Sequence, residues 1–147
     1  EREILPVARQ LGIGITAYGV LSRGLISGHW SPERSADAHD FRGMSPRFQG
    51  ENVARNLALV ETLKAIAAAK AATAAQVAIA WVAAQGDDIV PLVGARRRDR
   101  LAESLGALAV NLTHEDLKRL DDAFPNGVAA GARYPEFALH ELDSEKR

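Results

Sequence analysis

Apolar residues recur at two different spacings along this chain of 147 residues, and the spacings predict where helices and strands lie. Near the start, Ile4, Val7 and Leu11 recur at helical spacing, and Gly12 stands where a helix commonly ends. A short β-branched run then predicts a strand over Ile13–Tyr18. The first segment is therefore expected to be a helix followed directly by a strand.

A long polar segment separates this strand from the next helical pattern. Residues 21–55 are rich in glycine, serine, proline and charged side chains, which predicts a loop. Within it, Ser31 and Pro32 form the one place where a helical turn is expected to start. Loops of this length without regular structure are uncommon in compact domains and often carry function. This loop is therefore a candidate functional segment.

Two helical patterns follow the loop. The first begins at about residue 53 and continues through an alanine-rich stretch to residue 70. One face of it carries Leu59, Leu63 and Ile66. The second begins at Thr73, with Gln76 three residues later as its capping-box partner. Its inner face is expected to carry Val77, Ala80, Trp81 and Ala84. Gly86 is expected to end it.

A second strand and two further helices complete the pattern. The nearly unbroken apolar run DIVPLVG predicts a strand over Ile89–Val93, buried on both faces as in a parallel sheet. A helix is predicted over residues 96–105. Another is predicted after Thr113, where Asp116 completes a capping box. The stretch from Pro125 onward is expected to be loop-like.

The order of these elements is typical of an α/β protein. Strands that alternate with helices form βα units and a parallel sheet. Two strands do not make a sheet, however, and a (β/α)₈ barrel needs ~250 residues. If the parent fold is such a barrel, this chain supplies about the last quarter of its strands. We expect the chain by itself to be aggregated, oligomeric or molten, with its helices formed, because its strand edges are open. The inner faces of the helices around Leu63 and Trp81 are also expected to lack part of their cover.

Composition narrows the classes of partner. The net charge is −1, with 25% charged and 47% apolar residues, as in a globular domain. A balance so close to neutral argues against general binding to nucleic acid or to membrane surfaces. The chain has no cysteine, which fits a reducing compartment, and no apolar run approaches the ~18 residues of a membrane span. We expect a cytoplasmic protein with neither nucleic acid nor membrane as partner.

A glycine motif near the start has the wrong context for the function it suggests. Gly12–Ala17 matches G-x-G-x-x-A, and Asp37 follows about 20 residues later, as in a dinucleotide-binding fingerprint. That fingerprint lies between a strand and a following helix. Here it lies between a helix and a following strand, so its glycines would not face a helix N-terminus. The motif is therefore weak evidence for a nucleotide site.

The run VGARRRDRLAES has the context that the first motif lacks. A strand, a glycine and a helix start place free backbone N–H groups at the strand's carboxyl end, which is an anion site. Arginine suits phosphate because its planar fork carries paired donors. The alternative is a solvated helix start, although positive charge there is unfavourable by a few tenths of a kcal/mol without an anion. Spacing alone leaves both interpretations open for Arg96–Arg98 and Arg100.

The loop after the first strand also contains residues suited to a ligand. Gly19, Gly24 and Gly28 let the backbone approach a ligand closely. Tyr18, at the end of the strand, is positioned either to stack on a flat ring or to be half buried in the core. The sequence alone does not choose between these two roles.

Two of these segments together resemble the C-terminal half of the aldo-keto reductases. They are GITAYGVLSRGLISG and IVPLVGARRRDRLAESLGAL, and the intervening helices match as well. The resemblance implies a (β/α)₈ TIM barrel whose C-terminal portion is this chain. Ile13–Tyr18 and Ile89–Val93 would be the seventh and eighth strands. Residues 1–147 would be a partial barrel domain, with the N-terminal half before residue 1.

The family resemblance implies NADP as cofactor and hydride transfer to a small aldehyde or ketone. Tyr18 would stack on the nicotinamide, and the loop that follows it would surround the pyrophosphate. The 2′-phosphate and the adenine would lie beside the second loop and helix. The residues implied are Tyr18, Gly19, Val20, Leu21, Ser22, Arg23, Gly94, Ala95, Arg96, Arg100, Glu103 and Ser104.

The chain departs from the family at several of these positions. Gly19 stands where the family usually has serine, and Val20 where it often has proline. Ala95 lacks a hydroxyl that relatives often carry, and Ser104 replaces a more common asparagine. The cationic part of the phosphate pocket is retained, so the resemblance still favours NADP over NAD.

The resemblance places the family's catalytic Asp, Tyr, Lys and His before residue 1, so no catalytic residue is expected in this chain. A substrate rim would come from Trp30, Tyr134 and Phe137. No metal site is expected, because His29, His39, His114 and His140 show no ligand spacing. Two other functions remain open: a non-catalytic nucleotide-sensing or interaction subunit, and a nucleic-acid-binding helix over Arg96–Arg100. An oligomer is possible.

Overall fold

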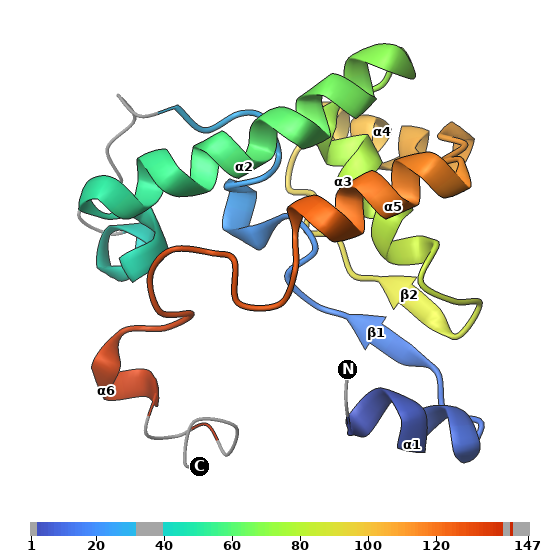
Figure 1. The fold of residues 1–147 in the computed structure, drawn as a ribbon, viewed down its shortest axis with the longest axis horizontal. Helices are drawn as coiled ribbons and strands as arrows, with labels where there is room; N and C mark the ends of the chain where they lie inside the picture. Colours follow the sequence, from blue (N-terminus) through green and yellow to red (C-terminus); the bar gives the residue numbers. More distant parts are fainter. Residues whose placement is uncertain (1–2, 32–39, 140–141, 143–147) are drawn as a thin grey trace.

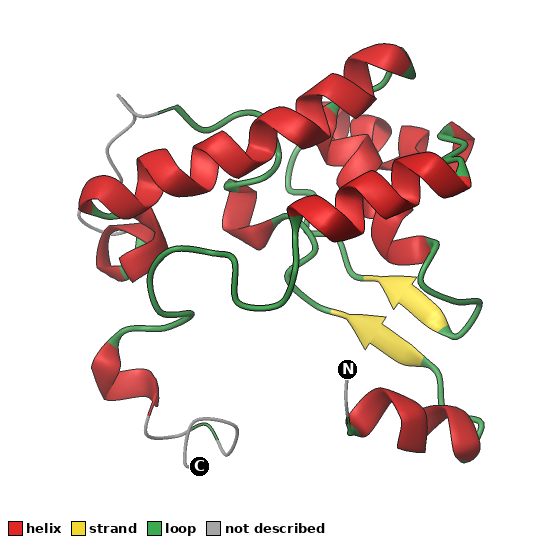
Figure 2. Ribbon diagram, in the orientation of Figure 1, coloured by secondary structure: helices red, strands yellow, loops and turns green. Residues whose placement is uncertain are grey.

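The computed structural model describes residues 3–31, 40–139 and 142 of the chain (Figures 1 and 2). The strands are β1 (Ile15–Ala17) and β2 (Ile89–Pro91). The helices are α1 (Ile4–Gln10), α2 (Gly50–Ala69), α3 (Ala74–Ala83), α4 (Arg98–Leu105), α5 (His114–Ala123) and α6 (Glu136–Leu139). Short 3₁₀ turns lie at Ser22–Gly24, Phe41–Met44, Pro46–Phe48 and Gly106–Ala109. The expected helical turn at Ser31 and Pro32 extends outside the described residues.

The two strands pair in parallel, as the alternation of strands and helices predicts. Ile15 lies opposite Ile89 and Ala17 opposite Pro91, and the two strands lie side by side in Figure 1. Both are shorter than the predicted Ile13–Tyr18 and Ile89–Val93. Among the described residues each strand pairs only with the other, so each strand has one edge without a paired strand.

The prediction that the strands are buried on both faces is wrong for the chain as the structure describes it. Burial alternates along β2 and beyond, with Val90 57% and Leu92 58% exposed between partly buried neighbours. In β1, Thr16 is likewise exposed between partly buried Ile15 and Ala17. Helix α3 contacts β2 on one face. No other described element covers the opposite face, so its apolar side chains remain in contact with water.

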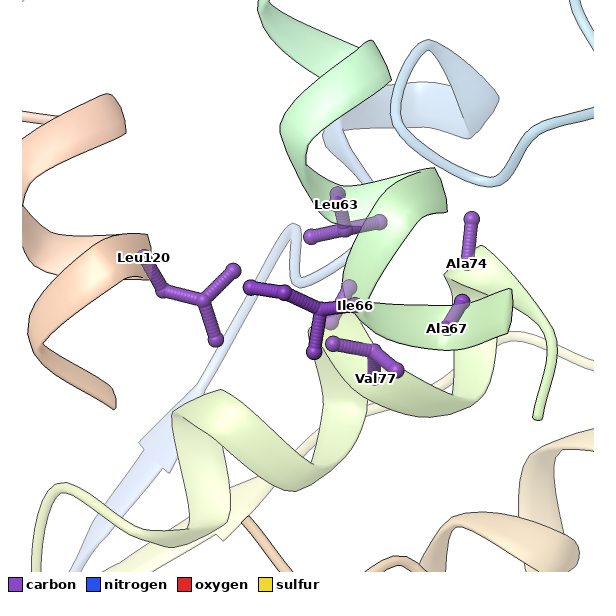
Figure 3. Close-up of a cluster of buried hydrophobic side chains, with 7 residues drawn as sticks. Leu63, Ile66, Ala67, Ala74, Val77 and Leu120 are labelled. Carbon is purple, nitrogen blue, oxygen red and sulfur yellow. The ribbon is translucent and has the colours of Figure 1, made fainter. Parts of the chain in front are cut away.

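The main hydrophobic core lies between three helices (Figure 3). Leu63 and Ile66 of α2, Val77 of α3 and Leu120 of α5 are all 0% exposed. Alanines of α2 and α3 fill the space between them and let the two helices approach closely. The chain therefore covers the inner face of α2 around Leu63 completely.

The local signals at the helix ends are confirmed. The Thr73 N–H donates to Gln76 Oε1 at 2.8 Å, and the Gln76 N–H donates to Thr73 Oγ1 at 3.2 Å. Thr113 and Asp116 form the same reciprocal cap at the start of α5. These contacts satisfy N–H groups that the first turn leaves without helical partners.

Several details of the helix predictions differ. Helix α4 begins at Arg98 rather than at residue 96, and α6 lies in the tail that was expected to be loop-like. Helix α2 begins at Gly50 rather than Val53, which extends it into the segment expected to be a loop. Its buried face carries Val60, at 0% exposure, where Leu59 was expected. Ala84 is exposed rather than inward-facing, because α3 already ends at Ala83.

Among the described residues, no single helix is long and apolar enough to cross a membrane. Helices α2 and α3 together would have the length and composition, but they meet at 92° and their buried faces form the core just described.

Candidate cofactor site

The parallel pairing brings two loops to one end of the sheet. Because β1 and β2 run in the same direction, the segments that leave them emerge at the same edge, where ligands bind in α/β sheets. Residues 18–31 follow β1, and residues 92–97 lead from β2 into α4. The predicted cofactor residues lie in these loops and in the first two turns of α4.

The first loop is anchored by two apolar side chains. Val20 is 8% exposed and packs with Ile79 and Ala107, and Leu21 is partly buried against the same cluster. Their side chains therefore serve the core, and only their backbone groups are available to a ligand.

Backbone conformations in this loop are unusual. The φ angles of Ser22 and Arg23 are 47° and 57°, in the left-handed region that residues other than glycine rarely adopt. Gly19 and Gly24, on either side, also have positive φ. For residues other than glycine, such conformations are unfavourable by roughly 1–3 kcal/mol each, and they are frequent at ligand sites. The 3₁₀ turn at Ser22–Gly24 is thus a constrained turn at the sheet's carboxyl edge.

The second loop leads into a helix whose N-cap residue makes no capping hydrogen bond. Gly94 and Arg96 are exposed and Ala95 is partly buried ahead of α4. Arg97 occupies the N-cap position, but no side chain caps the helix. Arg97 instead pairs with Asp99 at 2.7 Å, within the same turn. The hydrogen bond from Arg97 and the backbone N–H groups of Asp99 and Arg100 lower the pKa of Asp99, so an anion at the start of α4 would compete with this carboxylate for the N–H donors.

Arg100 connects the two loops. Its Nη1 lies 2.8 Å from Glu103 Oε2 and 2.5 Å from Nε2 of His29, which belongs to the loop after β1. His29 also lies 3.4 Å from Glu103 Oε2. Partial burial alone would raise the pKa of Glu103, but hydrogen bonds from Arg100, Thr73 and His29 lower it overall. The carboxylate therefore stays charged and fixes the guanidinium beside both loops.

His29 is the functional candidate that sequence reasoning missed. It stands 71 residues from Arg100, and no spacing signal connects the two. Ser104, which was predicted on the adenine side, donates its hydroxyl to the Arg100 carbonyl at 2.8 Å within α4. The Gln76 side chain donates to the Glu103 carbonyl at 3.0 Å and so attaches α4 to α3.

The predicted stacking residue has an accessible ring. Tyr18 is 70% exposed, and its hydroxyl lies 3.3 Å from that of Tyr134 in the C-terminal tail. This hydrogen bond lowers the pKa of Tyr18 and raises that of Tyr134, and either hydroxyl can be its donor. The half-buried core role considered for Tyr18 does not describe its side chain here.

The three predicted rim residues occupy different environments. Trp30 is only 6% exposed, with Phe48 edge-on at 4.9 Å and Arg42 over its ring at 4.8 Å. Phe137 is 68% exposed, and Tyr134 is partly buried beside Tyr18. Their contact with a substrate stays a prediction. Among the described residues, no group of three His, Asp or Glu side chains is placed to hold a metal ion.

These features define a class of protein: a parallel α/β fold whose ligand loops follow the strands. Comparison with known proteins identifies the family. The Aldo/keto reductase family matches residues 1–124, and the chain belongs to this family.

Similar proteins include a probable aldo-keto reductase 1 of Glycine max, 41% identical over 134 residues. The aldo-keto reductase yakc [NADP(+)] of Schizosaccharomyces pombe is 39% identical over 135 residues. These matches cover 91% and 92% of this chain but only 38% and 40% of the relatives. The chain therefore spans about two fifths of their length.

The structure resembles a glycerol dehydrogenase of Gluconobacter oxydans with a TM-score of 0.79 at 28% sequence identity. The likeness covers 89% of this chain and 40% of that structure. The fold is therefore part of an aldo-keto reductase (β/α)₈ barrel, with two of its parallel strands described here.

Proposed function

We propose that this chain is the C-terminal, cofactor-binding part of an NADP-dependent aldo-keto reductase that reduces a small aldehyde or ketone. In this proposal β1 and β2 are the seventh and eighth barrel strands. The catalytic groups come from the N-terminal half of the barrel, which precedes residue 1. Family membership and the NADP(+)-dependent relative at 39% identity support the assignment.

The observation that carries the proposal is the meeting of His29, Arg100 and Glu103. It places a fixed guanidinium in the first turn of α4, whose N-cap residue makes no capping hydrogen bond, and joins that turn to the loop after β1. A 2′-phosphate at this position would receive N–H donors from the helix start and paired donors from arginine. That combination selects NADP over NAD, because NAD offers a hydroxyl group at the same place.

The two loops also indicate where the other groups of the cofactor would bind. The nicotinamide would stack on the exposed ring of Tyr18, and the pyrophosphate would cross the constrained turn that contains Ser22 and Arg23. Location in the cytoplasm and a small carbonyl substrate belong to the same proposal.

Replacing Arg100 by alanine tests the phosphate pocket. In equilibrium dialysis of the chain, Arg100→Ala should weaken NADPH binding at least tenfold more than NADH binding. The reason is that a hydrogen bond to a charged group contributes about 1.5–3 kcal/mol. Arg119→Ala, an exposed arginine on α5, is the matched control and should change neither affinity. Equal losses for both cofactors in Arg100→Ala would remove the 2′-phosphate role.

The proposed division of labour has its own test. Residues 1–147 alone should show no NADPH-dependent reduction of benzaldehydes, because a carbonyl oxygen needs a positioned proton donor that this part of the barrel does not supply. Joining the chain to the N-terminal part of the Schizosaccharomyces pombe relative should restore turnover. Turnover by the chain alone would show that the catalytic groups are misplaced in this account.

A further inference from the structure

The C-terminal tail is fixed against the start of α2 by one buried amide. Asn56 is 3% exposed, and its Nδ2 donates to the carbonyls of Arg47 and Ala130 at 3.0 and 2.9 Å. The Ala130 N–H donates back to Asn56 Oδ1 at 2.8 Å. A Cβ atom at Gly131 would come within 2.8 Å of the Pro46 backbone, so the tail packs closely against Pro46 at this point. Its path past the site is set by these contacts.

This path gathers three arginines from three distant segments. Arg23 Nη1 donates to the Arg133 carbonyl at 3.4 Å, and the Arg23 guanidinium lies over the Tyr134 ring at 4.9 Å. Arg133 lies over the same ring at 5.7 Å. Burial lowers the pKa of Arg47, and the nearby charges of Arg133 and Arg23 lower it further. Arg23 and Arg133 therefore lie beside Tyr134, and Arg47 lies within electrostatic reach of both.

Arg23, Arg47 and Arg133 form an arginine cluster, and two of the three have no carboxylate partner among the described residues. Among the described residues, Arg23 and Arg47 form no ion pair with a carboxylate, whereas the nearby Arg42 pairs with Asp40. The Nε of Arg47 is buried and has no hydrogen-bond partner. An unsatisfied buried donor of this kind is unfavourable by ~1–3 kcal/mol, and by more for a charged group. A bound anion would relieve both the repulsion and the missing hydrogen bond.

We propose that Arg23, Arg47 and Arg133, with Tyr134, bind an oxyanion carried by the carbonyl substrate, either a carboxylate or a phosphate monoester. This rests on the proposed function, because the nicotinamide must stack on Tyr18 for the cluster to adjoin the reacting carbonyl. The Tyr18 hydroxyl points toward Tyr134, so the arginines lie beyond the hydroxyl edge of the stacking ring.

The cofactor's own phosphates are the other candidate anion. Arg23 lies in the loop that the proposed function gives to the pyrophosphate, but Arg47 and Arg133 lie outside the two cofactor loops, in the segment before α2 and in the tail. The proposed 2′-phosphate pocket around Arg100 is built from different residues. We therefore assign the cluster to the substrate, and the experiment includes the cofactor as a separate arm.

The test uses two benzaldehydes that differ only in charge: 4-carboxybenzaldehyde and the neutral 4-formylbenzamide. Each is dialysed against the 147-residue chain at fixed ionic strength, with and without NADP⁺. The carboxylate should bind at least tenfold more tightly than the amide. Arg47→Met and Arg133→Gln should each weaken binding of the carboxylate at least fivefold and leave the amide unchanged. Arg119→Gln, far from the cluster in sequence, is the control and should leave both affinities unchanged.

Stability separates a binding role from a structural one. Arg47→Met keeps the apolar stem and removes both the repulsion and the unpaired Nε. The variant should therefore melt at the same temperature as the parent or at a higher one, although it binds the carboxylate less well. If Arg47→Met loses both carboxylate binding and thermal stability, Arg47 has a structural role and its assignment to the anion site is overturned. In that case Arg133→Gln, at an exposed residue, tests whether the remaining arginines bind the carboxylate.

The remaining outcomes distinguish the sources of the anion. Equal affinity for the two aldehydes would overturn the proposal. Displacement of the carboxylate by NADP⁺, with Arg47→Met weakening NADP⁺ equally, would overturn it in favour of the cofactor's phosphates. Discrimination between the aldehydes without any NADP⁺ binding would retain the anion site and reject the proposed function.

Discussion

The helical layer and the strand pair differ in how completely this chain buries them. Helices α2, α3 and α5 enclose a core in which Leu63, Ile66 and Leu120 are 0% exposed. On the free face of β2, by contrast, Val90 and Leu92 are more than half exposed, at 57% and 58%. Every helix in that core obtains its cover from within the chain. The strands do not, because within the part of the chain that the structure describes each has a single neighbour.

The difference shows which contacts are local to this part of a barrel. In a closed barrel the inward-facing side chains of all strands fill the interior together. Two strands leave that interior face without partners, whereas the outer helices still pack on one another. The loops that follow β1 and β2 lie at the boundary between the two regions. Val20 anchors the first of these loops to the well-packed side.

The largest expected effect is on the helical core. Leu63→Ala should lower the free energy of unfolding by about 2–5 kcal/mol, because it leaves a cavity between α2, α3 and α5. Leu92→Ala, on the exposed strand face, should change it by less than about 0.5 kcal/mol. Urea denaturation followed by far-UV circular dichroism measures both. Similar losses for the two variants would erase the distinction between the regions.

The next effect concerns the amide that fixes the tail. Asn56→Ala should lower the free energy of unfolding by on the order of 2 kcal/mol, because it leaves partners of three buried hydrogen bonds unsatisfied. It should also weaken binding of 4-carboxybenzaldehyde, since the tail carries Arg133. Asn52→Ala, one turn earlier and with a single hydrogen bond to the Pro46 carbonyl, is the control and should have the smaller effect on both. If binding of the carboxylate survives in Asn56→Ala, the tail is not held by this residue.

A pH dependence should appear at the start of α5. The Lys70 ammonium and the Thr113 N–H and hydroxyl lower the pKa of Asp116 from 3.8 to about 2. Because the folded-state pKa is depressed, this carboxylate stabilises the fold above about pH 4, and the stabilisation is lost as the pH falls toward 2. Asp116→Asn should cost about 1–2 kcal/mol at neutral pH and flatten that part of the acid unfolding curve. An unchanged curve would contradict this role.

Substitutions on the exposed face of β2 are expected to have the smallest effect on the free energy of unfolding. They should change the oligomeric state of the chain. Sedimentation should show oligomers of the chain that Val90→Lys shifts toward monomer, because charge on an exposed edge opposes pairing. Near-UV circular dichroism should stay strong in both, since Trp81 is held by a 2.9 Å hydrogen bond to Asp121. A parent chain that is already monomeric would show that the open face does not associate.

Features set by neighbouring residues were predictable from the sequence. The capping boxes at Thr73 and Thr113 and the alanine-rich helix depend on contacts within a few residues, and all are present. The parallel pairing of β1 and β2 followed from the alternation of strands and helices. The burial of the strands on both faces did not hold, because burial depends on partners that composition alone does not supply.

Site residues joined across the chain were not predictable in the same way. His29 meets Arg100 only because two parallel strands deliver their loops to one edge. Arg47 and Arg133 approach each other only because Asn56 fixes the tail to α2. The family resemblance pointed to Tyr18 and Arg100 through motifs, but no motif connects these other residues.

NADP⁺ is proposed to lie across the two loops at the carboxyl ends of β1 and β2. Hydrogen–deuterium exchange of the chain with and without saturating NADP⁺ tests this most directly. Exchange should slow in residues 19–29 and 94–104 and stay unchanged in the core of α2 and α5. Protection confined to the helical layer, or no protection at a concentration where dialysis shows binding, would contradict the claim.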